Sequence, residues 1–287
     1  MAARIVAQRF AGPLAARLQI PDRDALALYW LGQAGFVMRA GGLRILVDPY
    51  LSDTLGDKYR GTTTPHDRMM PVPVSVEALG AVDLALLTHH HTDHMDPGTL
   101  APLAARNPTL RFVAPKAARD EALRRTGASQ DRLVLVDAGE TVEPLPGVKV
   151  VALRAAHETL ATDANGCHRF LGCALIVSTP RGSVGVLDSG DTIPFAGQAE
   201  EMRRLAPDLL LLPVNGRSRG VLGNMTLEEA CALAAAAGAP AMIAHHFGMC
   251  AFNTNPREAV EAKAADLDLP FRLLPASEDL EVRLEGV

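Results

Sequence analysis

The chain has 287 residues, of which 48% are hydrophobic and 21% charged. A chain of this length and composition can bury a substantial core, which is typical of a globular protein and excludes a disordered or fibrous one. The formal net charge of -5 argues against a nucleic-acid partner that is recognised through bulk positive charge. No apolar run reaches the length of a membrane span and the four cysteines form no Cys-x-x-Cys pair, so we expect a cytoplasmic protein with no membrane partner.

The first part of the chain predicts an antiparallel opening. Residues 25–31 and 35–38 have the pattern of two strands, and Gly41-Gly42 makes a turn into a third strand at 43–47. Residues 49–73 are rich in proline and polar side chains and predict a long loop of the kind that often covers a functional site. We expect residues 1–24 to form an N-terminal extension, an amphipathic segment lying on the domain.

From residue 75 onward the predicted helices and strands alternate. Thr226 and Glu229 form a capping-box signature before an Ala-rich helix. Without a linker or repeat, two β-rich halves that are each followed by helices predict one domain, residues 1–287, with two sheets face to face and helices outside. The predicted helices span 75–79, 97–105, 116–126, 197–205, 227–237 and a segment from 256, and the predicted strands span 83–87, 110–114, 132–136, 147–154, 170–178, 183–187, 209–214, 241–244, 271–274 and 279–283.

The short apolar strand at 83–87 leads into a loop that is crowded with metal-binding side chains. His89, His91, Asp93 and His94 lie within six residues, in the pattern His-x-His-x-Asp-His. Ligands that follow the carboxyl end of a strand are typical of α/β sites. Imidazole and carboxylate without thiolate suit zinc, iron or manganese. The alternative is a solvent-exposed histidine tract with adventitious metal affinity.

Three further apolar strands end in residues of the same type. His157 follows one strand, Asp191 follows another, and His245-His246 ends a third. One histidine after a strand is more often a hydrogen-bonded structural residue than a ligand. Four such strand ends in one chain favour a common metal centre.

Together these residues resemble the metallo-β-lactamase fold superfamily of metal-dependent hydrolases. The resemblance implies an α/β fold, a four-layer αββα sandwich with a dinuclear site at one edge between the sheets. His246 is preferred to His245 because the sequence His-Phe-Gly-Met resembles the context of the last ligand in that superfamily. The implied cofactors are two divalent metal ions, zinc or manganese, one held by His89, His91 and His157 and the other by Asp93, His94 and His246, with Asp191 bridging them.

Several loop motifs resemble one branch, the L-ascorbate-6-phosphate lactonase family. They are Trp-Leu-Gly-Gln-Ala-Gly-Phe at 30–36, Asp-Pro-Tyr-Leu-Ser-Asp at 48–53, Pro-Val-Asn-Gly-Arg at 213–217, Gly-Asn-Met-Thr at 223–226 and Asn-Thr-Asn-Pro at 253–256. The resemblance covers roughly residues 28 to 262. It departs from the family at the N-terminus, where the lactonases carry a longer leading segment. It implies that a metal-bridging hydroxide attacks a lactone or ester carbonyl of an anionic, sugar-like substrate, with Asp93 and Asp191 as catalytic residues.

Three residues beyond the Leu-rich strand at 209–214 are candidate substrate contacts: Asn215, Arg217 and Arg219. A guanidinium offers a bidentate fork for phosphate or carboxylate, and the alternative is a solvated basic turn. Asp48 ends a strand and is a candidate to hydrogen-bond a ligand imidazole from outside the ligand set. The alternative for Asp48 is a capping carboxylate in the Asp-Pro turn.

Two other functions fit the same residues. One is a phosphodiesterase that uses the same two metal ions. The other is a non-catalytic metal-dependent sensor, which would hold metal without hydrolysing any ester, lactone or phosphodiester. The expected partner is a small-molecule anionic substrate, and the sequence leaves a homo-oligomer open.

Overall fold

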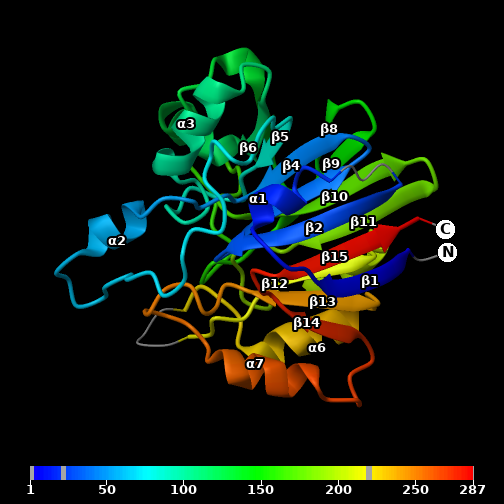
Figure 1. The fold of residues 1–287 in the computed structure, drawn as a ribbon. Helices are drawn as coiled ribbons and strands as arrows, with labels where there is room; N and C mark the ends of the chain where they lie inside the picture. Colours follow the sequence, from blue (N-terminus) through cyan, green and yellow to red (C-terminus); the bar gives the residue numbers. More distant parts are fainter. Residues whose placement is uncertain (1–2, 21–23, 218–221, 287) are drawn as a thin grey trace.

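Two mixed β-sheets lie face to face, with helices on the outer surface of each (Figure 1). The computed structural model describes residues 3–20, 24–217 and 222–286. This arrangement confirms the predicted αββα sandwich. No helix within the described ranges is long and apolar enough to cross a membrane.

The first sheet has eight strands and contains both ends of the described chain. It is antiparallel from its β1 edge to β4 and parallel from β4 to β7. Its order is β1 (Arg4–Arg9), β15 (Leu280–Glu285), β2 (Ala25–Gly32), β3 (Gly35–Ala40), β4 (Leu43–Val47), β5 (Leu84–Leu86), β6 (Arg111–Pro115) and β7 (Leu133–Val136).

The second sheet has seven strands. Its strands β11 to β14 are parallel, so the segments after β12 and β13 leave the sheet at one edge. Its order is β14 (Arg272–Pro275), β13 (Ala241–His245), β12 (Leu209–Pro213), β11 (Gly182–Asp188), β10 (Leu171–Thr179), β9 (Val148–Arg154) and β8 (Thr141–Leu145).

Strand β2 shows why the sheets stack in this way. Its side chains alternate, as in any strand: Leu28 and Trp30 enter the core shared with the second sheet, while Tyr29 and Leu31 belong to the core beneath the first helical layer. All four side chains are at most 2% exposed. Burying such a side chain stabilises the fold by about 1.5–3 kcal/mol, so the strand needs an apolar layer on both faces.

Helices α3 (Pro97–Arg106) and α4 (Arg119–Thr126) cover the first sheet, and a 3₁₀ turn at Lys116–Ala118 leads into α4. Helices α5 (Gln198–Arg204), α6 (Leu227–Ala237) and α7 (Arg257–Ala264) pack on the second sheet. The predicted capping box is present at the start of α6: Glu229 N donates to Thr226 Oγ1 at 3.2 Å, and Thr226 N donates to Glu229 Oε2 at 3.0 Å.

Two local expectations were wrong. Residues 75–79 form a single turn, because the segment between Pro73 and Gly80 is too short for a stable helix. The long loop expected at 49–73 contains a helix, α2 (Thr54–Tyr59), which projects from the side of the sandwich (Figure 1).

The N-terminal segment does more than lie on the domain. Residues Arg4–Arg9 form the edge strand of the first sheet, paired antiparallel to β15. A short helix, α1 (Leu14–Arg17), follows and buries Leu14. The start of the described chain is therefore part of the first sheet.

Candidate metal centre

The loop after β5 is held in a fixed shape by the elements on either side. Met95 N donates to His91 O at 2.8 Å, which closes one turn, and Asp96 accepts from Gly98 N at 3.0 Å to cap α3. From α4, Arg125 donates to Met95 O at 2.8 Å. These contacts fix the backbone that carries the histidines.

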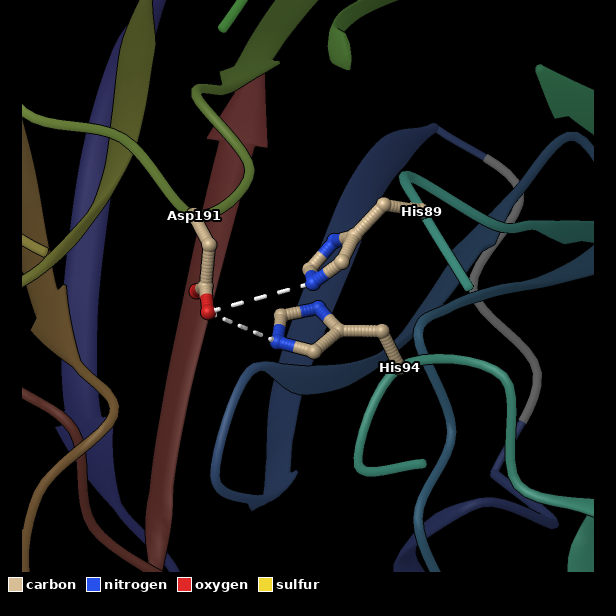
Figure 2. Close-up of side chains that lie close together, drawn as sticks. All are labelled: His89, His94 and Asp191. Atoms are coloured by element: carbon tan, nitrogen blue, oxygen red, sulfur yellow. Dashed lines mark ion pairs between the residues drawn. The ribbon is translucent and has the colours of Figure 1, made fainter. Parts of the chain in front are cut away.

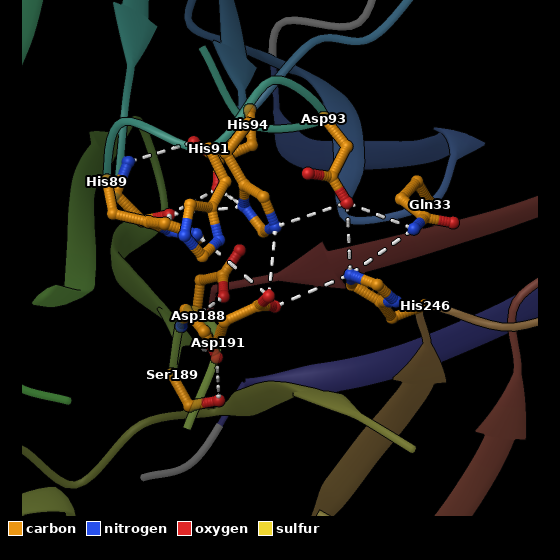
Figure 3. Close-up of polar contacts among 12 residues, drawn as sticks. Gln33, His89, His91, Asp93, His94, Asp188, Ser189, Asp191 and His246 are labelled. Carbon is orange, nitrogen blue, oxygen red and sulfur yellow. Dashed lines mark hydrogen bonds and ion pairs between the residues drawn. The ribbon is translucent and has the colours of Figure 1, made fainter. Parts of the chain in front are cut away.

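All seven predicted metal-ligating residues converge at one edge between the sheets. Their donor atoms form three groups within which the atoms lie no more than 4.8 Å apart. Figure 2 shows His89 and His94 directed at Asp191, and Figure 3 shows Asp93 and His246 on the other side of the same carboxylate. The groups are His89, His94 and Asp191; His91, His157 and Asp191; and Asp93, His94 and His246.

The spacing of the donor atoms fits divalent metal ions. Two donors bound about 2.1 Å from one tetrahedral ion lie about 3.4 Å apart. Asp191 Oδ2 lies 3.3 Å from His94 Nε2 and 4.0 Å from His157 Nε2. On the other side, His246 Nε2 lies 3.4 Å from Asp93 Oδ2 and 3.5 Å from Asp191 Oδ1.

Several donor atoms are buried and lack a hydrogen-bond partner within the described chain, among them His89 Nε2, His94 Nε2 and Asp191 Oδ1. A buried polar atom without a partner costs about 1–3 kcal/mol, so a group of them in one place points to a missing ligand. A cation that accepts lone pairs from all of them is the group this donor set fits.

Four of the seven side chains have pKa shifts that favour metal binding. Burial, reinforced by neighbouring histidines, holds the pKa of His89 well below its usual value, and burial lowers the pKa of His91 to about 4. Burial alone would raise the pKa of Asp93 and of Asp191, but His94 and His246 outweigh it and hold both well below their usual range. Neutral imidazoles and ionised carboxylates are the forms that bind metal. Burial alone would lower the pKa of His94 and of His246, but Asp191 and Asp93 outweigh it and raise both, so a metal ion competes with protons at these two imidazoles.

Asp48 lies directly behind His94. Its Oδ2 is 2.6 Å from His94 Nδ1, and its Oδ1 accepts from Thr88 N at 2.8 Å. Its φ of 40° lies in the left-handed region, which a non-glycine residue rarely adopts. The contact fixes the His94 ring with its Nε2 turned towards Asp191.

Two glycines leave the space that Asp191 and His157 need. Gly190 has a φ of +59°, and a Cβ there would lie 2.3 Å from Leu171 O, so only glycine fits before Asp191. A Cβ on Gly223 would lie 2.3 Å from His157 Cε1. On its other side His157 stacks on Phe170, with ring centroids 5.0 Å apart.

The structure describes two of the three predicted substrate contacts, Asn215 and Arg217. Arg217 Nη2 donates to Glu229 Oε1 at 2.8 Å, which pairs it with the start of α6. Asn215 is 2% exposed, and neither its amide oxygen nor its nitrogen has a partner in the described residues. Arg219 lies outside the described residues. Their role in substrate binding stays a prediction.

A cavity of about 410 Å³ opens above the donor cluster. Sequence reasoning missed several residues that line it: Gln33, Lys58, Tyr59, Asn224 and Phe252. Gln33 and Asn224 stand in the Gly-Gln-Ala-Gly and Gly-Asn-Met-Thr motifs, which could have pointed to them. Lys58 and Tyr59 carry no such signal, because they stand in a segment that looks like an irregular loop.

His245, His168 and Cys250 do not line the cavity. His245 packs edge-on against Phe36, with ring centroids 5.4 Å apart, while His246 faces the cluster. His168 pairs with Asp137 at 3.0 Å, away from the donors. Cys250 is 3% exposed, and burial raises its pKa to about 12, so it is a buried thiol.

The fold and this donor set define a metal-dependent hydrolase of the metallo-β-lactamase type. The family model of the β-lactamase superfamily domain matches residues 43–247. A UPF0173 metal-dependent hydrolase of Aeropyrum pernix is 32% identical over 197 residues, which cover 66% of this chain and 71% of the relative. The chain therefore belongs to the metallo-β-lactamase superfamily and, within it, to the UPF0173 metal-dependent hydrolases.

Other relatives and solved structures agree on the fold. A protein of Mycobacterium tuberculosis is 31% identical over 136 residues, and the match spans 47% of this chain and 35% of that longer protein. The metallo hydrolase Igni18 of Ignicoccus hospitalis superposes with a TM-score of 0.67 at 18% identity, covering 92% of this chain and 100% of the other. The isothiocyanate hydrolase from Delia radicum gut bacteria superposes with a TM-score of 0.68 at 19% identity, covering 89% of this chain and 98% of the other. At these identities the two structures show the fold alone.

Proposed function

We propose that this protein hydrolyses a lactone or ester carbonyl of a small anionic substrate, in the manner of the L-ascorbate-6-phosphate lactonases, with two divalent ions, zinc or manganese. One observation carries the proposal: seven metal-type residues converge, and five of them line a cavity that also holds the cations Lys58 and Arg125. A floor of metal ligands below positive side chains suits a substrate with a reactive carbonyl and a separate negative charge.

The proposed reaction is simple hydrolysis. The oxygen of water joins the carbonyl carbon, the carbon–oxygen bond to the alcohol breaks, and the alcohol oxygen takes the remaining proton. When bound, the divalent ions would lower the pKa of a water and polarise the carbonyl oxygen.

Side chains of the protein would position the attacking water and the substrate. Gln33 Nε2 donates to Asp93 Oδ2 at 3.1 Å, which keeps that carboxylate directed at the cavity. Asp93 would orient the attacking water, and Asp191 would help to hold both ions, as the resemblance implies. Asn224 is 3% exposed and lines the cavity, where its amide can hydrogen-bond the substrate.

The test is hydrolysis of L-ascorbate 6-phosphate by protein loaded with zinc or manganese. Bis(4-nitrophenyl) phosphate serves as the phosphodiester comparison. We expect turnover of the lactone that is lost when the ions are chelated and returns when they are restored. Turnover of the phosphodiester alone would contradict the proposal in favour of a phosphodiesterase, and bound metal without turnover of any ester, lactone or phosphodiester would favour a sensor.

A further inference from the structure

One side of the cavity is an aromatic wall, made of Tyr59, His66 and Phe252. The rings of Tyr59 and His66 stack, with centroids 4.3 Å apart and an interplanar angle of 28°. The centroids of His66 and Phe252 lie 5.0 Å apart. The wall joins two segments that are far apart in the sequence, namely α2 with the loop behind it and the loop that follows His246.

Backbone contacts hold this wall in place. Met69 N donates to Met249 O at 2.7 Å, and Ala251 N donates to Asp67 O at 3.0 Å, so the loop behind α2 is tied to the segment after β13. His66 Nδ1 contacts Thr64 O at 2.8 Å, so it carries the proton and leaves Nε2 as an acceptor. Because the anchoring segment begins just after His246, the wall keeps a fixed position relative to the metal-type donors.

Lys58 adds a positive charge at the rim of the wall. Its side chain is exposed, its ammonium lies 5.0 Å from the centroid of Tyr59, and the described part of the chain offers it no ion-pair partner. The other cation of the cavity, Arg125, is engaged by Glu121 and by the carbonyl oxygen of Met95. Lys58 is therefore the cation that is left to meet an anionic group.

We propose that the aromatic wall and Lys58 select substrates in which an aromatic ring carrying a carboxylate or phosphate is attached to the ester or lactone carbonyl. This inference rests on the proposed function and names its substrate class. Aromatic rings attract other aromatic groups, through the ring edge or the ring face, beyond the apolar area that is buried, and the ammonium attracts the acidic substituent. A cavity of about 410 Å³ is large enough for such a molecule.

The test compares four methyl esters that share one leaving group, using metal-loaded protein. Methyl phenylacetate and methyl cyclohexylacetate differ in aromaticity, while methyl 4-carboxyphenylacetate and methyl 4-carbamoylphenylacetate differ in charge. We expect the KM of the phenyl ester to be several-fold to about tenfold lower than that of the cyclohexyl ester. At low salt we expect the KM of the carboxylate ester to be about threefold to fivefold lower than that of the carbamoyl ester.

Three substitutions assign each preference to its residues. Tyr59→Leu and Phe252→Leu should each reduce the preference for the phenyl ester, whereas Lys58→Gln should remove only the preference for the carboxylate. Lys149→Gln changes an exposed lysine of β9 and serves as the matched control that keeps both preferences. Equal KM values for the phenyl and cyclohexyl esters in the unaltered protein would overturn the proposal, as would a Lys58→Gln variant that loses affinity for charged and neutral esters alike.

A binding measurement keeps this inference separate from the proposed function. If no ester is hydrolysed, the same four compounds are titrated into the metal-loaded protein and their Kd values are measured by calorimetry. The same order of affinities would support the aromatic, acidic ligand class while removing the hydrolytic function. Affinities that differ neither with aromaticity nor with charge would overturn the inference.

Discussion

At the scale of single residues, His94 shows how the centre is held ready for metal. It takes part in two of the three donor groups through Nε2, and its Nδ1 lies 2.6 Å from Asp48. Asp48 is fully buried and is itself fixed by Thr88 N, so the carboxylate cannot turn away. An imidazole oriented in this way does not have to be ordered when the ion binds.

We therefore expect Asp48→Asn to weaken metal binding about 10–100-fold, because the amide cannot replace the carboxylate behind His94. Metal affinity is measured by titration with a competing chelator. Asp120→Asn is the control, since the Asp120 side chain is 91% exposed on α4. Equal metal affinity in the Asp48→Asn variant and the unaltered protein would show that this contact does not support the centre.

Gly223 also supports the metal centre without being a metal ligand. An added Cβ would lie 2.3 Å from His157 Cε1, so Gly223→Ala should displace that imidazole. We expect metal content and activity to fall about tenfold or more. The far-UV circular dichroism should be unchanged, because the fold is not affected. Gly185→Ala is the matched control, because a Cβ there meets nothing closer than 3.8 Å. Full metal content in Gly223→Ala would contradict this account of His157.

The sequence could reveal the ligand residues because four of them are close together and each of the others follows a strand. It could not reveal Tyr59 or Lys58 as lining residues, since their place in the cavity depends on how distant loops fold back. Arg217 shows the opposite error. From the sequence, a basic residue near a strand end is expected to be free to bind an anionic substrate, but Glu229 at the start of α6 pairs with it.

At the scale of elements, α3 positions the ligand loop by packing beneath it. The helix starts at the Asp96 cap directly after the loop, and it buries Leu100 and Leu103 against the first sheet. The orientation of the loop therefore depends on the apolar face of this helix.

Leu100→Ala should lower the free energy of unfolding by about 2–5 kcal/mol, because Leu100 is fully buried and its removal leaves a cavity in the core between α3 and the first sheet. Urea unfolding monitored by circular dichroism measures the change. Leu267→Ala, at a side chain that is 97% exposed, should leave stability within about 0.5 kcal/mol of the unaltered protein. Similar losses in the two variants would contradict the packing described for α3.

Most elements were predictable from apolar periodicity, including the strands that carry the ligands. The missed or wrong elements are short or unusual ones, such as α2, β1, β8 and the turn at 75–79. Strand β1 has no fully buried residue, although Ile5 and Ala7 pack against the core. It exists because β15 offers a partner that lies far away in the sequence. Tertiary pairing of this kind leaves no local pattern.

At the scale of the whole molecule, one buried carboxylate joins the two ends of the described chain. Glu281 on β15 accepts hydrogen bonds from Tyr29 at 2.5 Å, from Gln8 at 2.6 Å and from Arg17. Burial alone would raise the pKa of Glu281, but these donors outweigh it and lower the pKa below its usual value. Protonation of this group therefore opposes folding.

The sign of the pH dependence follows directly. A lowered folded-state pKa contributes stability that is fully present above the unfolded-state pKa of about 4.3 and is lost as the pH falls through the folded value. Glu281→Gln should remove this contribution, so its destabilisation relative to the unaltered protein should be largest near neutral pH and should shrink in acid. Urea unfolding of both proteins from pH 7 to pH 3 measures it, and a pH-independent difference would contradict the role given to Glu281.

The most direct test of the metal centre is the number of divalent ions bound per chain, measured by elemental analysis after loading with zinc or manganese. We predict that the unaltered protein binds two ions. The His91→Ala variant should lose both the ion held by His91 and His157 and the hydrolytic activity, while its fold stays intact. His168→Ala is the control, because His168 pairs with Asp137 outside the centre. A protein that binds no divalent ion, or a His91→Ala variant that keeps both ions and full turnover, would contradict the assignment of this site.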